Sequence, residues 1–152
     1  MAYDIILLNT TPGTHSISDT LIEAYRQVIE ASGKTIKIYH IRDIDFNQDL
    51  IDGYKTKLSP VVKTMQQEIT AAKMVTIYTP IYRGAFPGKF KSLFDQLLWP
   101  HVAFNMKEKK YLWAGLWRGK KARIIYSLGG DEITYRLLSA RSGITQLKRS
   151  FY

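Results

Sequence analysis

The chain has 152 residues, of which 45% are hydrophobic and 23% charged, as is typical of one soluble globular domain. The chain contains no cysteine, so disulfides and thiolate chemistry are excluded, and its three histidines are far apart in the sequence, so no metal site is expected. No apolar run reaches the ~18 residues of a membrane span, and no signal-peptide pattern is present. We therefore expect no membrane span and a cytoplasmic location. The net charge of +9 favours anionic partners such as phosphate groups or nucleic acid.

Apolar strand-like segments alternate with amphipathic helical segments along the chain. The predicted strands are residues 4–9, 35–41, 74–78 and 121–127. The first predicted helix ends at Gly33, the second begins at Ser59-Pro60, and the third follows Pro87. The apolar stripe of the first helix consists of Leu21, Ile22, Tyr25, Val28 and Ile29.

Two segments fall outside this regular alternation. Residues 43–58 form a polar loop of unusual length, and such loops tend to be functional or mobile. The segment after residue 131 is predicted to be helical or mixed, with Gly143 interrupting it. The alternation as a whole predicts one α/β domain over residues 1–152, a doubly wound parallel sheet with right-handed crossovers.

The loop after the third predicted strand is the most informative part of the sequence. It runs from Thr79 to Pro87 and contains prolines, glycines and aromatic residues. In open α/β sheets, ligands bind in such turns at the carboxyl ends of the strands. Prolines fix the backbone there, and Gly84 and Gly88 allow a flat ligand to approach it closely. We therefore expect a rigid loop that faces a ligand.

The loops after the first and fourth predicted strands should emerge along the same edge. The first loop carries hydroxyl groups just before a helix, whose dipole favours an anion such as phosphate; alternatively, Ser16 or Ser18 only caps that helix. The fourth strand is followed by Gly129-Gly130, where a ring could rest against bare backbone, or which forms a simple turn. A phosphate site beside a flat apolar surface predicts a mononucleotide with a large ring, and FMN is the candidate.

Short motifs carry a family resemblance over nearly the whole chain. The chain resembles the flavodoxin-like NAD(P)H:quinone oxidoreductases, which include the drug-activity modulator, and its Pro80 loop is also similar to that of NADPH-dependent FMN reductases. The matching segments are residues 14–18, 45–47, 79–82, 94–96, 99–100, 119–122 and 129–130.

The resemblance implies a flavin bound noncovalently at a homodimer edge. Hydride would pass from NAD(P)H through the flavin to a quinone or a similar acceptor. FMN is favoured over FAD, which remains possible, because FAD needs an adenine-binding surface that extra chain length often supplies. Together, the loops and the resemblance predict Tyr135 as the catalytic residue and a set of flavin-binding residues. That set is Thr10, His15, Ser16, Ile17, Ser18, Pro80, Ile81, Tyr82, Arg83, Gly84, Ser127, Gly129 and Gly130.

The sequence departs from the family pattern in two places. Arg141 stands where well-studied quinone reductases have a histidine that works with the tyrosine. No segment after Ser127 predicts the usual fifth strand, so we expect a sheet of order 2-1-3-4 with the fourth strand at an exposed edge.

Two other functions stay open. The first is a flavin-binding regulatory subunit with little turnover of its own. The second is nucleic-acid binding, which the net charge and the aromatic residues among Lys107 to Arg118 suggest, although we expect no nucleic-acid partner.

Overall fold

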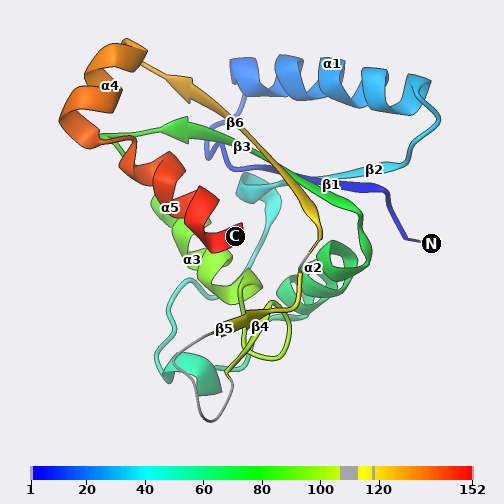
Figure 1. Ribbon diagram of the computed structural model, residues 1–152. Helices are drawn as coiled ribbons and strands as arrows, with labels where there is room; N and C mark the ends of the chain where they lie inside the picture. Colours follow the sequence, from blue (N-terminus) through cyan, green and yellow to red (C-terminus); the bar gives the residue numbers. More distant parts are fainter. Residues whose placement is uncertain (1, 107–112, 118, 152) are drawn as a thin grey trace.

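The computed structural model describes residues 2–106, 113–117 and 119–151 (Figure 1). Its main sheet contains four parallel strands: β1 (Ile5–Asn9), β2 (Ile36–His40), β3 (Met74–Ile81) and β6 (Lys121–Leu128). Their order is β2-β1-β3-β6, which confirms the predicted order, with the fourth predicted strand at an edge. The described residues after β6 form helices and add no further strand to the sheet.

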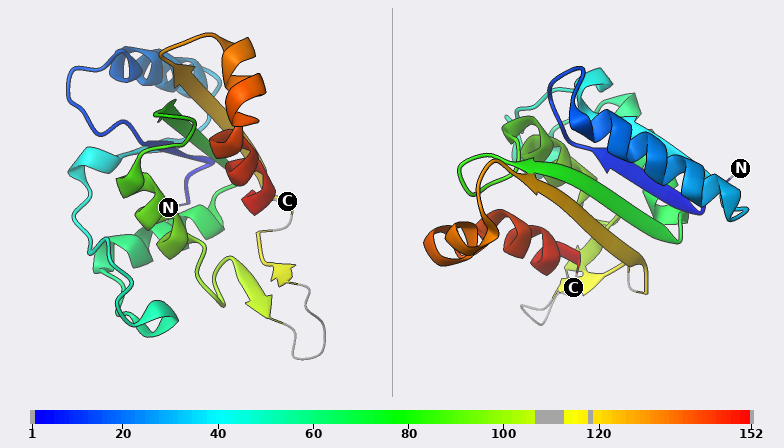
Figure 2. Two further views of the ribbon diagram at one scale, coloured as in Figure 1. Left: turned by 90° about the vertical axis from the view of Figure 1, so that its left-hand side faces the viewer. Right: turned by 90° about the horizontal axis from the view of Figure 1, so that it is seen from above.

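Five α-helices are described around this sheet: α1 (Ile17–Ala31), α2 (Pro60–Ala71), α3 (Gly88–Leu97), α4 (Glu132–Ser139) and α5 (Ser142–Phe151). Two short 3-10 helices are also described: η1 (Ile41–Asp43) directly follows β2 and ends where the predicted polar loop begins, and η2 (Gly53–Lys55) lies within that loop. Helix α1 lies against one face of the sheet, and α2, α3 and α5 lie against the other (Figure 1, Figure 2). None of the described helices is long and apolar enough to cross a membrane.

The two faces follow from the alternation of side chains along each strand. Ile6 and Leu8 of β1 point into the larger core, which contains side chains of α2 and α3 as well as Leu147 of α5. Leu7, between them, packs on the opposite face with Ile22 of α1. Strands buried on both faces read as continuous apolar runs, which is why the two central strands, β1 and β3, could be predicted from the sequence.

A two-stranded antiparallel sheet was not predicted. It consists of β4 (Phe104–Met106) and β5 (Trp113–Gly115). Each strand has three residues, too few for an alternating pattern to identify a strand in the sequence. Most of the segment considered for nucleic-acid binding, residues 107–112 and 118, lies outside the described residues.

The predicted interruption at Gly143 is wrong. The helices separate at Ala140 and Arg141, which have φ angles of 47° and 50°, and Gly143 lies within α5. Its amide donates a hydrogen bond of 3.0 Å to the carbonyl of Gly84. A Cβ atom at position 143 would come within 3.1 Å of both the Gly84 oxygen and the Ala85 Cα. This glycine is therefore needed for close packing of α5 against the loop after β3.

Replacing Gly143 with alanine should destabilise the protein despite the higher helix propensity of alanine. The new methyl group would push α5 away from the loop, and overpacking of this kind costs about 1–3 kcal/mol. Urea unfolding followed by circular dichroism measures the effect. Gly88→Ala is the control, since no atom lies within 4 Å of a Cβ there; equal stability of the two variants would refute this packing role.

Candidate functional site

The carboxyl ends of β1, β3 and β6 lie along one edge of the sheet, where the sequence places its candidate residues (Figure 1). A cavity of about 310 Å³ lies between the ends of β3 and β6 and helix α4. Six predicted residues line it: Ile81, Arg83, Gly84, Gly129, Gly130 and Tyr135. The structure thus brings together the loops after the third and fourth predicted strands.

The loop after β3 is a tight turn. Tyr82 and Ala85 exchange two backbone hydrogen bonds of 2.7 and 3.0 Å. The two residues between them, Arg83 and Gly84, have φ angles of 47° and 85°, as in a type I′ turn, which explains the glycine. Tyr82 is 52% exposed and does not line the cavity, and neither do Pro80 and Ser127, which are paired in the sheet register.

Helices α4 and α5 hold this turn through the carbonyl of Gly84. That oxygen accepts hydrogen bonds from the Gly143 amide at 3.0 Å, the Ser142 hydroxyl at 2.8 Å and the Tyr135 hydroxyl at 3.4 Å. The Tyr135 hydroxyl also accepts from the amide of Ile144 at 3.4 Å, and its side chain is 6% exposed. Tyr135 therefore reaches the cavity as predicted, while its hydroxyl is bonded to backbone on both sides.

The wall of the cavity formed by α4 carries a fixed negative charge. Asp131 caps α4, and its carboxylate accepts a 2.7 Å hydrogen bond from the amide of Thr134. This backbone hydrogen bond is the main reason that the pKa of Asp131 is lowered. Arg141, which stands in place of the expected histidine, forms an ion pair with Glu132.

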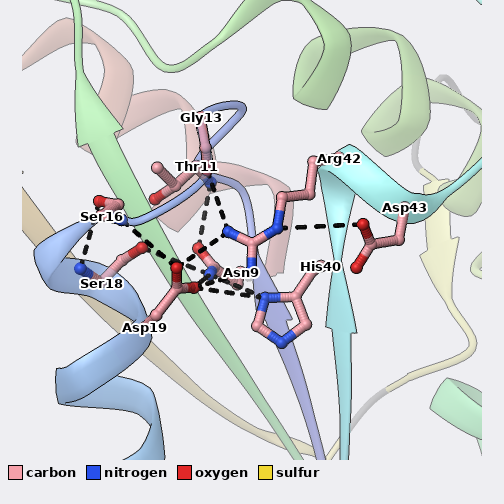
Figure 3. Close-up of polar contacts among 9 residues, drawn as sticks. All are labelled: Asn9, Thr11, Gly13, Ser16, Ser18, Asp19, His40, Arg42 and Asp43. Atoms are coloured by element: carbon pink, nitrogen blue, oxygen red, sulfur yellow. Dashed lines mark hydrogen bonds and ion pairs between the residues drawn. The ribbon is translucent and has the colours of Figure 1, made fainter.

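The loop after β1 ends in the capped start of α1 (Figure 3). Ser16 is the N-cap: its hydroxyl accepts from the amide of Ser18 at 3.3 Å, and its own amide donates to Asp19 at 3.4 Å. Ser16 thus caps the helix, which confirms that part of the alternative, and its role in holding a phosphate stays a prediction. His15 and Ile17 are exposed, and none of the predicted residues of this loop lines the 310 Å³ cavity.

Four residues that the sequence analysis missed hold this loop in place through polar contacts (Figure 3). Arg42 donates to both carboxylate oxygens of Asp19, at 3.0 and 3.1 Å, and to the carbonyl of Gly13 at 3.0 Å. Asn9 accepts from the amide of Thr11 at 3.1 Å and contacts His40 Nδ1 at 3.0 Å. Asn9 and His40 are paired in the register of β1 and β2, so knowing the strand order would have indicated this contact.

Two threonine hydroxyls next to this loop lack partners. Thr10 and Thr11 follow β1 and are 1% and 6% exposed, and within the described part of the chain their Oγ1 atoms form no hydrogen bond. An unsatisfied buried hydroxyl costs about 1–3 kcal/mol, so such groups need an explanation. Both oxygen atoms have almost no accessible surface, so a phosphate group would accept hydrogen bonds from them only after this loop opens.

Among residues 2–106, 113–117 and 119–151, no group of three or more His, Cys, Asp or Glu side chains could hold a metal ion.

Comparison with known proteins identifies the family of this chain. A family model described as a flavodoxin-like fold matches residues 4–152. An FMN reductase (NADPH) of Pseudomonas putida is 29% identical over 93 residues, or 61% of this chain and 46% of that protein. An FMN-dependent NADH:quinone oxidoreductase of Thiobacillus denitrificans is 35% identical over 66 residues, or 43% of this chain and 31% of that protein. The matches thus span less than half of either relative.

A solved structure of similar fold is an azoreductase from Bacillus anthracis. It superposes with a TM-score of 0.76 at 13% sequence identity, over 97% of this chain and 79% of that chain. At this identity the likeness supports the fold alone.

Replacing Arg42 with glutamine should raise the pKa of Asp19. Hydrogen bonding to Arg42 is the main cause of the lowered pKa of this carboxylate. Since the folded-state pKa lies below the unfolded value, the pair stabilises the protein above the unfolded pKa, and this stabilisation is lost as the pH falls through the folded pKa. The variant should therefore be less stable at neutral pH, and this difference should shrink in acid.

Carboxyl ¹³C NMR titration measures the shift directly. Lys73→Gln is a matched control, because Lys73 pairs with Asp4 at 2.9 Å and contributes, after the backbone of Thr35, to a pKa of about 2 for that carboxyl. The control should raise the pKa of Asp4 only. An unchanged Asp19 pKa in the Arg42 variant would show that the ion pair does not form in solution.

Proposed function

The chain belongs to the family with the flavodoxin-like fold, and we propose that it is a flavin-dependent NAD(P)H oxidoreductase that binds FMN. The observation that carries this proposal is the cavity of about 310 Å³ at the carboxyl ends of β3 and β6, which Gly84, Gly129 and Gly130 line. The loop after β1, with the unpartnered hydroxyls of Thr10 and Thr11, lies on the same sheet edge. A phosphate site and a backbone-lined cavity on one edge suit the two ends of a flavin mononucleotide.

Each end of the cofactor has its own residues in this proposal. The phosphate end is held by Thr10 and Thr11 with Ser16 to Ser18 and His15. The ring is held by Pro80 to Gly84 on one side and by Ser127, Gly129 and Gly130 on the other. When bound, FMN supplies a ring that accepts and donates hydride. The chain supplies position, backbone amides and the exclusion of water.

We propose that the main role of Tyr135 is to position the loop after β3. Its hydroxyl holds the Gly84 carbonyl and is held by Ile144, so it fixes the turn that faces the ring. A direct role in stabilising charge on the flavin remains a prediction from the resemblance.

A quinone or a similar flat acceptor is the proposed electron acceptor. The Thiobacillus denitrificans relative, named for quinone, supports this choice. The Pseudomonas putida relative is named an FMN reductase (NADPH), so free FMN is the competing acceptor.

We also propose a homodimer with the site near its interface. Ile133, Leu137 and Leu138 of α4 are 71–82% exposed, and Leu138 lines the cavity. Apolar side chains grouped in this way mark interaction surfaces. Sedimentation velocity tests the proposal; a monomer at tens of micromolar protein would exclude it.

The function is tested by the visible spectrum of the purified protein. After incubation with FMN and desalting, the protein should retain a flavin spectrum that bleaches when NADH or NADPH is added anaerobically. Adding menadione should restore the spectrum, whereas recovery with free FMN alone would favour an FMN reductase. Retained flavin that neither nucleotide bleaches would favour the regulatory alternative, and no retained flavin would refute the proposal.

The double substitution Thr10→Val and Thr11→Val should weaken FMN binding selectively. Valine keeps the shape of threonine but removes the hydroxyls, so we expect the Kd for FMN to rise about tenfold while the free protein loses no stability. Riboflavin, which lacks the phosphate, is the matched control ligand, and its Kd should not change. Equal weakening for both ligands, measured by fluorescence quenching, would place the phosphate elsewhere.

A further inference from the structure

A second and larger cavity lies away from the candidate flavin site. Its volume is about 670 Å³, and it lies between the polar loop around η2, the end of α3, the β4–β5 sheet and the end of α5. In Figure 1 these elements are in the lower half of the molecule, and α4 is at the upper left. No residue lines both this cavity and the 310 Å³ cavity. The two are therefore separate sites.

Apolar side chains on well-fixed backbone form the walls. They are Leu50 and Tyr54 of the polar loop, Leu98 at the end of α3, Ala103 just before β4, and Phe104, the first residue of β4. Tyr54 packs edge-on against Trp99, with ring centroids 5.2 Å apart. The amide of Ala103 donates to the carbonyl of Trp99 at 3.0 Å, and its carbonyl accepts from Leu116 at 2.7 Å. These contacts hold both sides of the cavity in place.

The charge of the cavity is positive. Two charged residues line it, Asp95 and Arg149. Asp95 is neutralised by Lys91, whose Nζ lies 2.5 and 2.6 Å from the two carboxylate oxygens. Arg149 is exposed and, among the described residues, forms no ion pair or hydrogen bond. Within the described part of the chain, one guanidinium without a partner therefore lies beside an apolar cavity.

We propose that this cavity binds an organic anion with an apolar body, that is, an aromatic or aliphatic carboxylate or sulfonate. The volume falls within the range of small-molecule sites, which is roughly 300–1,000 Å³. The planar guanidinium of Arg149 matches the paired oxygens of a carboxylate or sulfonate, and the apolar body would lie between Tyr54, Leu98 and Phe104. The proposal does not depend on the flavin site.

Two fluorescent probes test the proposal on the full chain. The probe 8-anilinonaphthalene-1-sulfonate carries an anion on an apolar body, and N-phenyl-1-naphthylamine has nearly the same body without charge. We expect the sulfonate to bind saturably, and Arg149→Gln to raise its Kd about tenfold without changing the Kd of the neutral probe. Saturating FMN should leave sulfonate binding unchanged.

Lys148→Gln is the matched control variant. Lys148 lies beside Arg149 in the last turn of α5, so it shares any favourable effect of a cation at the helix end, but it does not line the cavity. The control should bind the sulfonate like the unsubstituted protein, and both variants should have the same urea midpoint. The proposal is overturned by an absence of saturable binding, by equal weakening in both variants, or by displacement of the sulfonate with FMN.

Because each probe is read separately, the two hypotheses can fail separately. Sulfonate binding that depends on Arg149 in a protein that retains no FMN would support this cavity and refute the flavin proposal. Retained FMN without sulfonate binding would do the reverse.

Discussion

Strand β3 pairs with β1 on one side and with β6 on the other, and each loop of the candidate site takes its position from this pairing. The register joins five residues of β3 to β1 and all eight residues to β6. Because all three strands are parallel, their carboxyl ends meet at one edge. The turn after β3 is then anchored from outside the sheet, where the Gly84 carbonyl accepts hydrogen bonds from α4 and α5. Sheet and helices thus fix the same turn from two directions.

The sequence predicted those features that depend on local patterns. Buried strands appear as apolar runs, and a turn with two positive φ angles needs a residue such as Gly84, so the sheet order and the position of the loop could be predicted. Periodicity alone was less informative about burial. Leu21 and Val28 belong to the predicted apolar stripe of α1, yet they are 49% and 68% exposed, since a pattern identifies a face without showing what covers it.

Features that depend on distant contacts could not be predicted. Gly143 was interpreted as a helix breaker because glycine is a poor helix former, but its role comes from Gly84, 59 residues away in the sequence. The Asp19–Arg42 pair likewise joins the first turn of α1 to the residues after β2. Asp19 stands in a capping box with Ser16, which the sequence could have shown, but no local pattern indicates Arg42 as its partner.

This pair also explains how an acidic residue can lie at a proposed phosphate site. Asp19 caps α1 from its first turn, where its charge would repel an incoming phosphate. Arg42 binds both of its carboxylate oxygens, so the two charges offset each other while the cap is kept. The amide of Ser18 is already used by Ser16. In the proposed function, Arg42 would therefore reduce the repulsion of a phosphate at this loop without having to touch the ligand.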